Sequence, residues 1–221
     1  MSQIHRVDRL EDIPEPVPDG MYVVVDVIIS STSIIRLLEE GARYVRPFAD
    51  PVSALEFKER TADAVLVGED GGDPIDGFDL SPLPSIIRDA DLKGCPVGIR
   101  TSNGTRAMER IGSDDGIYVG STINAAATAR ELAESEEDVW IVAAGRQGNP
   151  IAEDIAGARL IHNHLDGSNE PTTDQLREQV RTSVTADWLR QIGFESELEA
   201  LLSFDSTDTV PRLEDGLFVA E

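Results

Sequence analysis

The sequence is poor in cysteine and lysine, and it contains no long apolar run. Its single cysteine, Cys95, cannot form a disulfide within the chain and leaves no cysteine-based metal cluster to consider. No run of about 18 apolar residues is present. Residues 1–20 are polar and rich in proline, unlike an export signal, which is charged and then apolar. These absences predict a soluble protein that is not exported, and we expect it to be cytoplasmic.

The chain is strongly acidic. Asp and Glu number 42 against 19 Lys and Arg, for a net charge of −23, and Lys58 and Lys93 are the only lysines. Such a surface repels nucleic acid and anionic membranes, so neither is an expected partner. Acid excess with scarce lysine favours a halophilic source, because concentrated salt screens self-repulsion while carboxylates keep the surface hydrated. A carboxylate therefore needs an argument from its location before it is called functional.

Length and patterning predict one domain. The chain has 221 residues, 40% of them apolar, which is enough for a substantial core. Strand and helix patterns alternate, which predicts a three-layer α/β/α fold around a mainly parallel sheet. Residues 166–174 are expected to link this fold to a helical C-terminal tail that is too short to be assigned to a separate domain. The predicted strands are 22–28, 44–48, 64–67, 97–101, 117–119, 139–143 and 216–220, and the predicted helices are 30–40, 51–61, 85–92, 103–111, 124–133, 151–165 and 175–204.

Small hydroxyl, amide and glycine residues follow five predicted strands. The carboxyl ends of parallel strands meet at one edge of a sheet, where helix N-termini also point, so these loops should lie close together. Such loops suit an anion held by backbone N–H and hydroxyl groups. Each loop taken alone also fits an ordinary cap or turn. The five segments are 29–32, 68–72, 101–105, 120–122 and 145–148.

Asp26 lies within an otherwise apolar predicted strand. A carboxylate there is costly unless it is hydrogen-bonded, bound to metal or placed in a cavity. A structural Asp bonded to loop N–H groups is the alternative. Glu69 ends the third predicted strand, and Glu153 and Asp154 lie in the first turns of a predicted helix. Mg²⁺ takes one or two carboxylates together with waters and substrate phosphate, so Asp26 with one of these acids would be sufficient.

Spacing argues against several other chemistries. Neither GxxxxGK[ST] nor a GxGxxG after a strand is present. Cys95 precedes its strand, and four residues separate it from Arg100, one fewer than a cysteine-based phosphatase loop needs. An aspartyl-phosphate enzyme would need an Asp where Ile28 stands. His162 and His164 fall near a helix end and fit surface residues better than a metal pair.

Seven short blocks occur in an order that resembles the 2-phosphosulfolactate phosphatases of the ComB family. The resemblance runs from about residue 20 to 218, and the joint order of the blocks is more specific than any one of them. The blocks are Asp26-Val27-Ile28 with Ser31-Thr32, Gly68-Glu69 with Gly71-Gly72, Phe78-Asp79-Leu80-Ser81-Pro82, Thr101-Ser102-Asn103-Gly104-Thr105, Gly120-Ser121 with Asn124-Ala125, Ala144-Gly145 with Gly148 and Glu153-Asp154, and Asp208 with Val210-Pro211.

The resemblance implies a three-layer α/β/α enzyme that uses Mg²⁺ to hydrolyse 2-phosphosulfolactate to sulfolactate and phosphate, a step of coenzyme M biosynthesis. The implied partner is a small anionic phosphorylated substrate, and a homo-oligomer stays open. The implied catalytic residues are Asp26 and Glu69, and the implied metal ligands are Asp26, Glu153 and Asp154. The implied substrate-binding residues are Ser31, Thr32, Thr101, Asn103, Gly104, Thr105, Ser121 and Asn124.

Two positions depart from the family's pattern. Ile29 stands where the arginine of DVLRAST belongs, and Asp70 replaces a common arginine in the Gly-Glu-Arg-Gly-Gly block. An arginine there would offer bidentate hydrogen bonds and stabilise transition-state charge. Arg100 and Arg146 are candidates to compensate. The alternatives are a non-catalytic or repurposed member that binds a small anion, and a phosphatase for another acidic metabolite.

Overall fold

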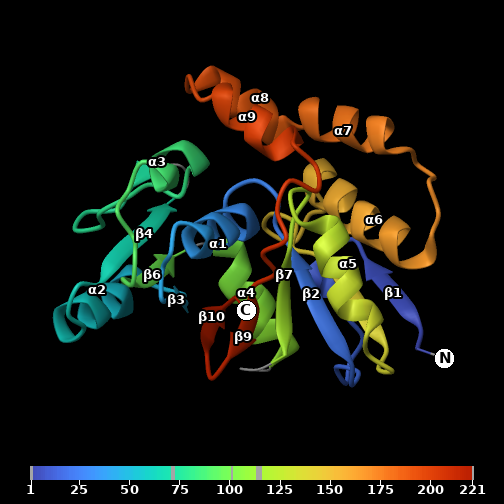
Figure 1. Cartoon of the computed structure of the whole chain (residues 1–221), viewed down its shortest axis with the longest axis horizontal. Coiled ribbons are helices and arrows are strands. Elements are labelled where there is room, and N and C mark those ends of the chain that lie inside the picture. The colour runs from blue at the N-terminus through green and yellow to red at the C-terminus, as the bar shows by residue number, and fades with distance from the viewer. Residues whose placement is uncertain (1, 71–72, 101, 113–115, 221) are drawn as a thin grey trace.

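The computed structural model describes residues 2–70, 73–100, 102–112 and 116–220, with the backbone alone for 102–105. Strands and helices alternate along most of this length (Figure 1). The strands are β1 (Ile4–Val7), β2 (Met21–Val25), β3 (Tyr44–Phe48), β4 (Val65–Asp70), β5 (Asp73–Pro74), β6 (Pro96–Arg100), β7 (Ile117–Gly120), β8 (Val139–Ala143), β9 (Arg212–Glu214) and β10 (Leu217–Val219). The helices are η1 (Leu10–Asp12, a 3-10 turn), α1 (Ser30–Glu39), α2 (Pro51–Arg60), α3 (Pro84–Arg88), α4 (Ser102–Ile111), α5 (Ala125–Ala133), α6 (Ala152–Asp166), α7 (Thr173–Arg181), α8 (Val184–Gln191) and α9 (Ser196–Leu202).

The described strands form one sheet in the order β1-β8-β2-β7-β9-β10-β3-β6-β4-β5. Strands β1, β8, β2 and β7 are parallel, and Val23 of β2 pairs with Ile141 on one side and Tyr118 on the other. Strands β3, β6 and β4 are also parallel, with Val45 and Val65 both opposite Val97. The three-layer α/β/α fold with a mainly parallel sheet is confirmed.

A C-terminal hairpin joins these two parallel groups. β9 pairs antiparallel with β7 through Arg212 and Tyr118, and β10 pairs antiparallel with β3 through Phe218 and Val45. The side chain of Phe218 is buried in the core. Sequence analysis predicts only the second strand of this hairpin, because β10 is apolar throughout, whereas β9 holds one leucine between two charged residues. The central pairing of the sheet is therefore made by the last residues of the chain.

Helices cover the two faces of the sheet. One core cluster joins Ile35 of α1 and Ile87 of α3 to Ile99 of β6. The second cluster joins Leu132 of α5 and Ile161 of α6 to the opposite sides of β2 and β8. Each fully buried aliphatic side chain contributes about 1.5–3 kcal/mol. A third cluster packs Phe57 of α2 with Phe48 of β3 and Leu66 of β4, so three apolar clusters in the described ranges hold the strands in place.

The helical tail packs on the second core. Leu176 of α7 and Leu189 of α8 are fully buried there, and α7 to α9 extend from α6 toward α3 (Figure 1). Glu197 of α9 is 2% exposed and accepts a hydrogen bond from the Ser85 N–H at 3.0 Å. The tail thus contacts both halves of the molecule. No helix in the described ranges is both long enough and apolar enough to span a lipid bilayer.

Several element boundaries follow local signals. Asp50 caps α2 by accepting the Ser53 N–H at 2.9 Å, with Pro51 as the first helical residue, and such a cap contributes about 1 kcal/mol. α6 ends at Gly167, whose φ of 72° is the left-handed conformation that glycine adopts without strain. The predicted strand 22–28, however, ends three residues early, at Val25. The residues that follow build the candidate site.

Candidate functional site

The turn between β2 and α1 is closed by Asp26 and Ser31. The Asp26 N–H donates to Ser31 Oγ, and the Ser31 N–H donates to the Asp26 carbonyl, both at 2.9 Å. This exchange takes Asp26 out of the sheet, so the prediction that it lies within the strand is wrong. It is the first residue beyond β2 and is 4% exposed. Ser31 does not cap α1, because its hydroxyl oxygen serves the turn instead.

Ile29, which immediately precedes α1, has an unfavourable backbone conformation. Its φ of 99° and ψ of −71° are close to a classic γ-turn and are rare for a β-branched residue. Such a conformation costs of order 1–3 kcal/mol and persists only where neighbouring bonds over-determine it. Here the Ser33 N–H donates to the Ile29 carbonyl at 3.1 Å, and Ser33 Oγ lies 2.6 Å from the Pro82 carbonyl oxygen. Strain of this kind is typical of functional turns.

Two of the predicted phosphate-binding hydroxyls lie together but inside the protein. Thr32 Oγ1 donates to the Val27 carbonyl at 2.7 Å, and it lies 2.8 Å from Ser121 Oγ at the end of β7. Since the Thr32 hydroxyl hydrogen is already used, Ser121 is the donor of that second bond. Both side chains are fully buried. They connect the loops after β2 and β7.

Asn124, another predicted substrate-binding residue, is also fully buried. Its Oδ1 accepts the Ser121 N–H at 2.8 Å, and its Nδ2 donates to the Val119 carbonyl at 3.1 Å and the Thr209 carbonyl at 3.0 Å. These three bonds close the turn between β7 and α5 and hold the segment that enters β9. The side-chain amide is thus occupied within the protein.

Asp154 links the loops that follow β2 and β8. Its Oδ1 accepts the Val27 N–H at 2.8 Å, and its Oδ2 accepts the Gly145 N–H at 3.0 Å. Gly145 has a φ of 66°, and a Cβ atom there would stand 2.5 Å from the Asn149 carbonyl oxygen, so only glycine fits. Asp154 itself is fully buried. Both of its carboxylate oxygens are therefore engaged by backbone.

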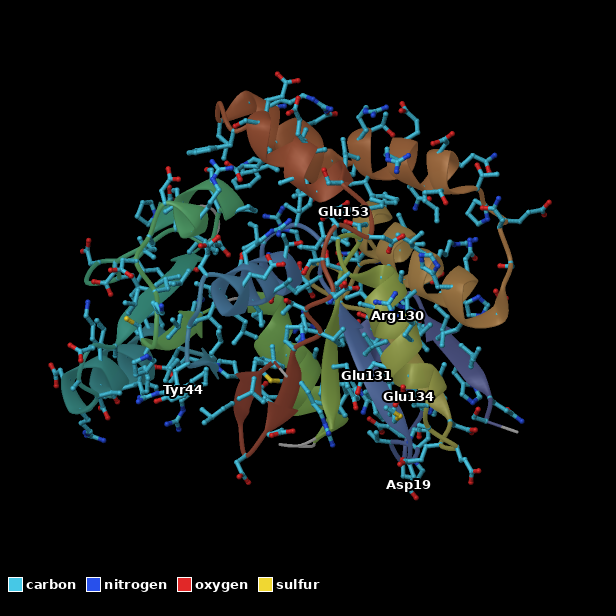
Figure 2. All side chains as sticks on the ribbon, in the orientation of Figure 1. Asp19, Tyr44, Arg130, Glu131, Glu134 and Glu153 are labelled. Carbon is cyan, nitrogen blue, oxygen red and sulfur yellow. The ribbon has the colours of Figure 1, made fainter. Side chains whose placement is uncertain are left out.

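Three carboxyl groups share this edge. Burial raises the pKa of the Asp154 carboxyl well above its usual range, the charges of Asp26 and Glu153 raise it further, and the bonds from the two backbone N–H groups act in the opposite direction. Glu153 is 1% exposed, and its Oε1 has no hydrogen-bond partner within the described chain. Figure 2 shows Glu153 at the edge where α6 begins. Unneutralised buried carboxylates of this kind suit a cation.

Gly157 lets α6 approach β2 closely, a role that sequence analysis misses. A Cβ atom at Gly157 would stand 2.8 Å from Val27 Cγ2 and 2.9 Å from Val25 Cγ1. The residue lies one helical turn beyond Glu153. A glycine four positions after an acidic residue at a predicted helix start is the local signal that could have indicated this contact.

Glu69 lies on a strand that is far in the sheet from β2, the strand that Asp26 follows. β4, which carries Glu69, is separated from β2 by β7, β9, β10, β3 and β6 in the sheet. The Glu69 carbonyl accepts the Arg100 Nη1 at 2.5 Å. Thr101 lies outside the described residues, and so do the side chains of Asn103 and Thr105. The backbone at Gly104 lies in the first turn of α4, which begins directly after β6.

The position of the second missing arginine holds an ion pair. Asp70 Oδ1 accepts the Arg100 Nη1 at 3.0 Å, and the Arg100 side chain is 13% exposed. The charge of Arg100 is thus offset by Asp70. Arg146 is exposed in the turn after β8, where its N–H donates to the Asn149 carbonyl at 2.8 Å.

A cavity of about 540 Å³ lies away from this edge, at the amino-terminal ends of β2 and β7. It is lined by Tyr22, Arg212 and several acids. Figure 2 shows Asp19, Glu131 and Glu134 at that end, opposite Glu153. Chemistry in parallel sheets belongs to the carboxyl ends of the strands, so we assign the site by its carboxylates and not by cavity volume.

No group of three or more His, Cys, Asp and Glu side chains in the described ranges is placed to hold one metal ion. Two carboxylates are nevertheless sufficient for Mg²⁺, which keeps several waters and takes its remaining ligands from substrate phosphate. Both oxygens of Asp154 are engaged by the loops after β2 and β8, whereas Glu153 Oε1 has no hydrogen-bond partner within the described chain. Asp26 is the other acid at this edge.

Comparison with known proteins agrees with this architecture. The sequence pattern of the 2-phosphosulpholactate phosphatase family matches residues 7–216. A probable 2-phosphosulfolactate phosphatase of Thermoplasma acidophilum is 35% identical over 199 residues, which cover 89% of this chain and 87% of that protein. A protein of the same name from Thermotoga petrophila is 33% identical over 216 residues, 92% and 93% of the two chains. The chain therefore belongs to the 2-phosphosulpholactate phosphatase family.

Proposed function

We propose that the protein is a phosphatase that hydrolyses 2-phosphosulfolactate, or a closely related phosphorylated 2-hydroxy acid, to the hydroxy acid and phosphate. The observation that carries this proposal is the group of buried carboxyls at the carboxyl ends of β2 and β8, beside the starts of α1 and α6. The names of the relatives supply the substrate class. Acids gathered there have no role in solvation, since they are buried.

The residues fit a magnesium ion. Glu153 Oε1 is buried without a hydrogen-bond partner in the described chain, which is the condition of an oxygen left for a cation. Asp26 and Glu153 would hold Mg²⁺, and Asp154 would stay with its backbone N–H groups. When bound, the ion neutralises phosphate charge and orients the substrate.

The chain's own groups then have distinct tasks. Asp26 accepts a proton from the water whose oxygen attacks phosphorus, the bond from phosphorus to the ester oxygen breaks, and that oxygen takes up a proton from solvent to become the hydroxyl of the product. Glu69 is assigned no role at this water, because five strands lie between β4 and β2 in the sheet. α1 begins next to Asp26, and the partial positive charge of a helix N-terminus favours the phosphate. Burial strengthens each of these interactions.

The setting that we propose is a salt-rich cytoplasm, and the reaction would supply sulfolactate for coenzyme M synthesis. The net charge of −23 supports the first point, because self-repulsion in the folded state is screened only by high ionic strength. The link to coenzyme M synthesis is what the family resemblance implies for this substrate. A homo-oligomer would be compatible with both.

The function is tested by phosphate release in concentrated KCl. We expect hydrolysis of 2-phosphosulfolactate that depends on Mg²⁺, is lost on chelation and returns when the ion is restored. Other phosphorylated 2-hydroxy acids, assayed at equal concentration, define the substrate class by their kcat/KM ratios. Phosphate release that is equal with and without chelator would contradict the metal assignment. No release from any member of the panel would contradict the phosphatase assignment.

A second candidate function is the binding of a small anion without hydrolysis. It is favoured by Ile29, which has no charge, and by the Asp70–Arg100 ion pair, in which Asp70 offsets the charge of Arg100. An enzyme that transfers phosphoryl groups normally places cations against the developing charge. Calorimetry that detects phosphate or sulfolactate binding in a chain without turnover would support this candidate.

Restoring the family's arginines separates the two functions. We expect Ile29→Arg to raise kcat/KM by about 10-fold or more, because the added charge-assisted donor beside the β2–α1 turn stabilises the transition state. Asp70→Arg is added in a second variant, where it removes the carboxylate that offsets Arg100. The matched control is Asp89→Arg, which adds the same side chain at a carboxylate that is 79% exposed and directly follows α3. A measurable gain from an inactive parent indicates a binding protein with an intact site. An equal change in the control would show that the effect is only one of net charge.

A further inference from the structure

Asp154 uses both of its carboxylate oxygens to accept hydrogen bonds from the loops after β2 and β8. A carboxylate in the first turn of a helix commonly satisfies N–H groups of its own helix start. Asp154 instead accepts the N–H of Val27, 127 residues away in sequence, and the N–H of Gly145. Neither oxygen is directed to solvent, since the residue is fully buried. This geometry is that of a clamp between the loops after two neighbouring strands.

The clamp acts on the backbone of Asp26. The Val27 N–H belongs to the peptide group that joins Asp26 to Val27, and the carbonyl of that same group accepts the Ser31 N–H. The preceding peptide group is held as well, because the Asp26 N–H donates to Ser31 Oγ. Both peptide groups that flank Asp26 are therefore fixed, and they set the direction in which its side chain leaves the backbone. Removing Asp154 releases one of the three bonds.

Stability alone does not account for this arrangement. Burying a carboxylate beside two others costs free energy, because the charged form loses its hydration and is repelled by its neighbours. We propose that Asp154 is a positioning residue that sets the Asp26 carboxylate in the site, and that it is not a metal ligand. The proposal rests on the proposed function for the role of Asp26, but its geometric part can be tested without any substrate.

Amide hydrogen exchange on the metal-free protein tests the clamp directly. Asp154→Asn keeps one carbonyl oxygen and turns an NH₂ group toward the other N–H donor, so one of the two bonds must be lost. We expect the Val27 or the Gly145 amide to exchange at least about tenfold faster in the variant. The matched control is Asp50→Asn, whose carboxylate also accepts two hydrogen bonds, at the start of α2. The control should leave both amides protected.

Kinetics then test whether the clamp acts through Asp26. We expect Asp154→Asn to lower kcat, and to raise the half-activating Mg²⁺ concentration, by about 10–100-fold in total, the usual effect of removing a group that orients a metal ligand. The double variant with Asp26→Asn should be no slower than Asp26→Asn alone, because the two residues work as a unit.

Two results would overturn the proposal: protected amides at both Val27 and Gly145 in the variant, or losses in kcat or in Mg²⁺ affinity that multiply in the double variant. If Asp154→Asn does not fold, Asp154→Glu keeps both acceptor oxygens and shifts them by one methylene, and the same measurements apply with smaller expected effects. A parent chain that releases no phosphate would contradict the proposed function, whereas the amide measurements would still decide the clamp.

Discussion

Asp26→Asn is expected to lower kcat for phosphate release by about 10²- to 10⁴-fold. The amide cannot take a proton from the attacking water at neutral pH, and it offers one weaker ligand oxygen to a cation. The backbone bonds between residue 26 and Ser31 are unaffected, because they use only main-chain atoms of Asp26. The loss should therefore appear in turnover and not in folding.

Thermal unfolding supplies the discriminating control. Since the charge of Asp26 raises the pKa of the buried Asp154 carboxyl, removing that charge relieves repulsion, and the midpoint should stay equal or rise. Asp89→Asn, the same substitution at an exposed carboxylate, should change neither quantity. Unchanged turnover in Asp26→Asn would refute the site assignment. A lower midpoint with unchanged turnover would make Asp26 a purely structural residue.

Asn124→Ala is expected to lower the free energy of unfolding by about 3–5 kcal/mol, because it removes the acceptor of the buried Ser121 N–H and the donor to two carbonyl groups. The groups affected belong to Ser121, Val119 and Thr209. Asn124→Asp should also destabilise, since it keeps the acceptor for the Ser121 N–H but replaces the donor by an oxygen facing two carbonyls. Urea denaturation measures both.

The matched control is Asn169→Ala, at an exposed position in the turn before α7, where the expected change is within about 0.5 kcal/mol. A stable Asn124→Ala with a raised KM would instead identify the side chain as a substrate ligand. The comparison thus decides between the role implied by the family resemblance and the role that the hydrogen bonds support.

Much of the fold can be predicted from the sequence, because its signals are local. Strands β3 and β8 coincide with their predicted ranges, and α2 and α6 begin and end within one residue of theirs. Alternating strand and helix patterns predict the layers for the same reason. Strands β1 and β9 are missed, since short strands are held by their neighbours and not by their own period.

The candidate site is predicted as a location but not as a set of roles. Ser121 and Asn124 share the residue types of anion-binding loops with ordinary turns, and sequence cannot tell which way a hydroxyl or amide points. In the structure the Ser121 hydroxyl donates to Thr32, and the Asn124 side chain closes the turn after β7. Glu69 and Asp26 appear equivalent as acids after strands, yet the sheet order separates β4 from β2.

The acidic character, the α/β alternation, the family resemblance and the place of Asp26 beside the first strong strand can all be read from the residues alone. The packed structure was needed to see that Asp26 lies just outside that strand, that Asp154 holds a loop 127 residues away, and that the β9–β10 hairpin joins the two parallel groups of the sheet. Caps, periodicity and turn residues act within a few positions of the chain, whereas a buried carboxylate finds its partners only after distant loops have packed.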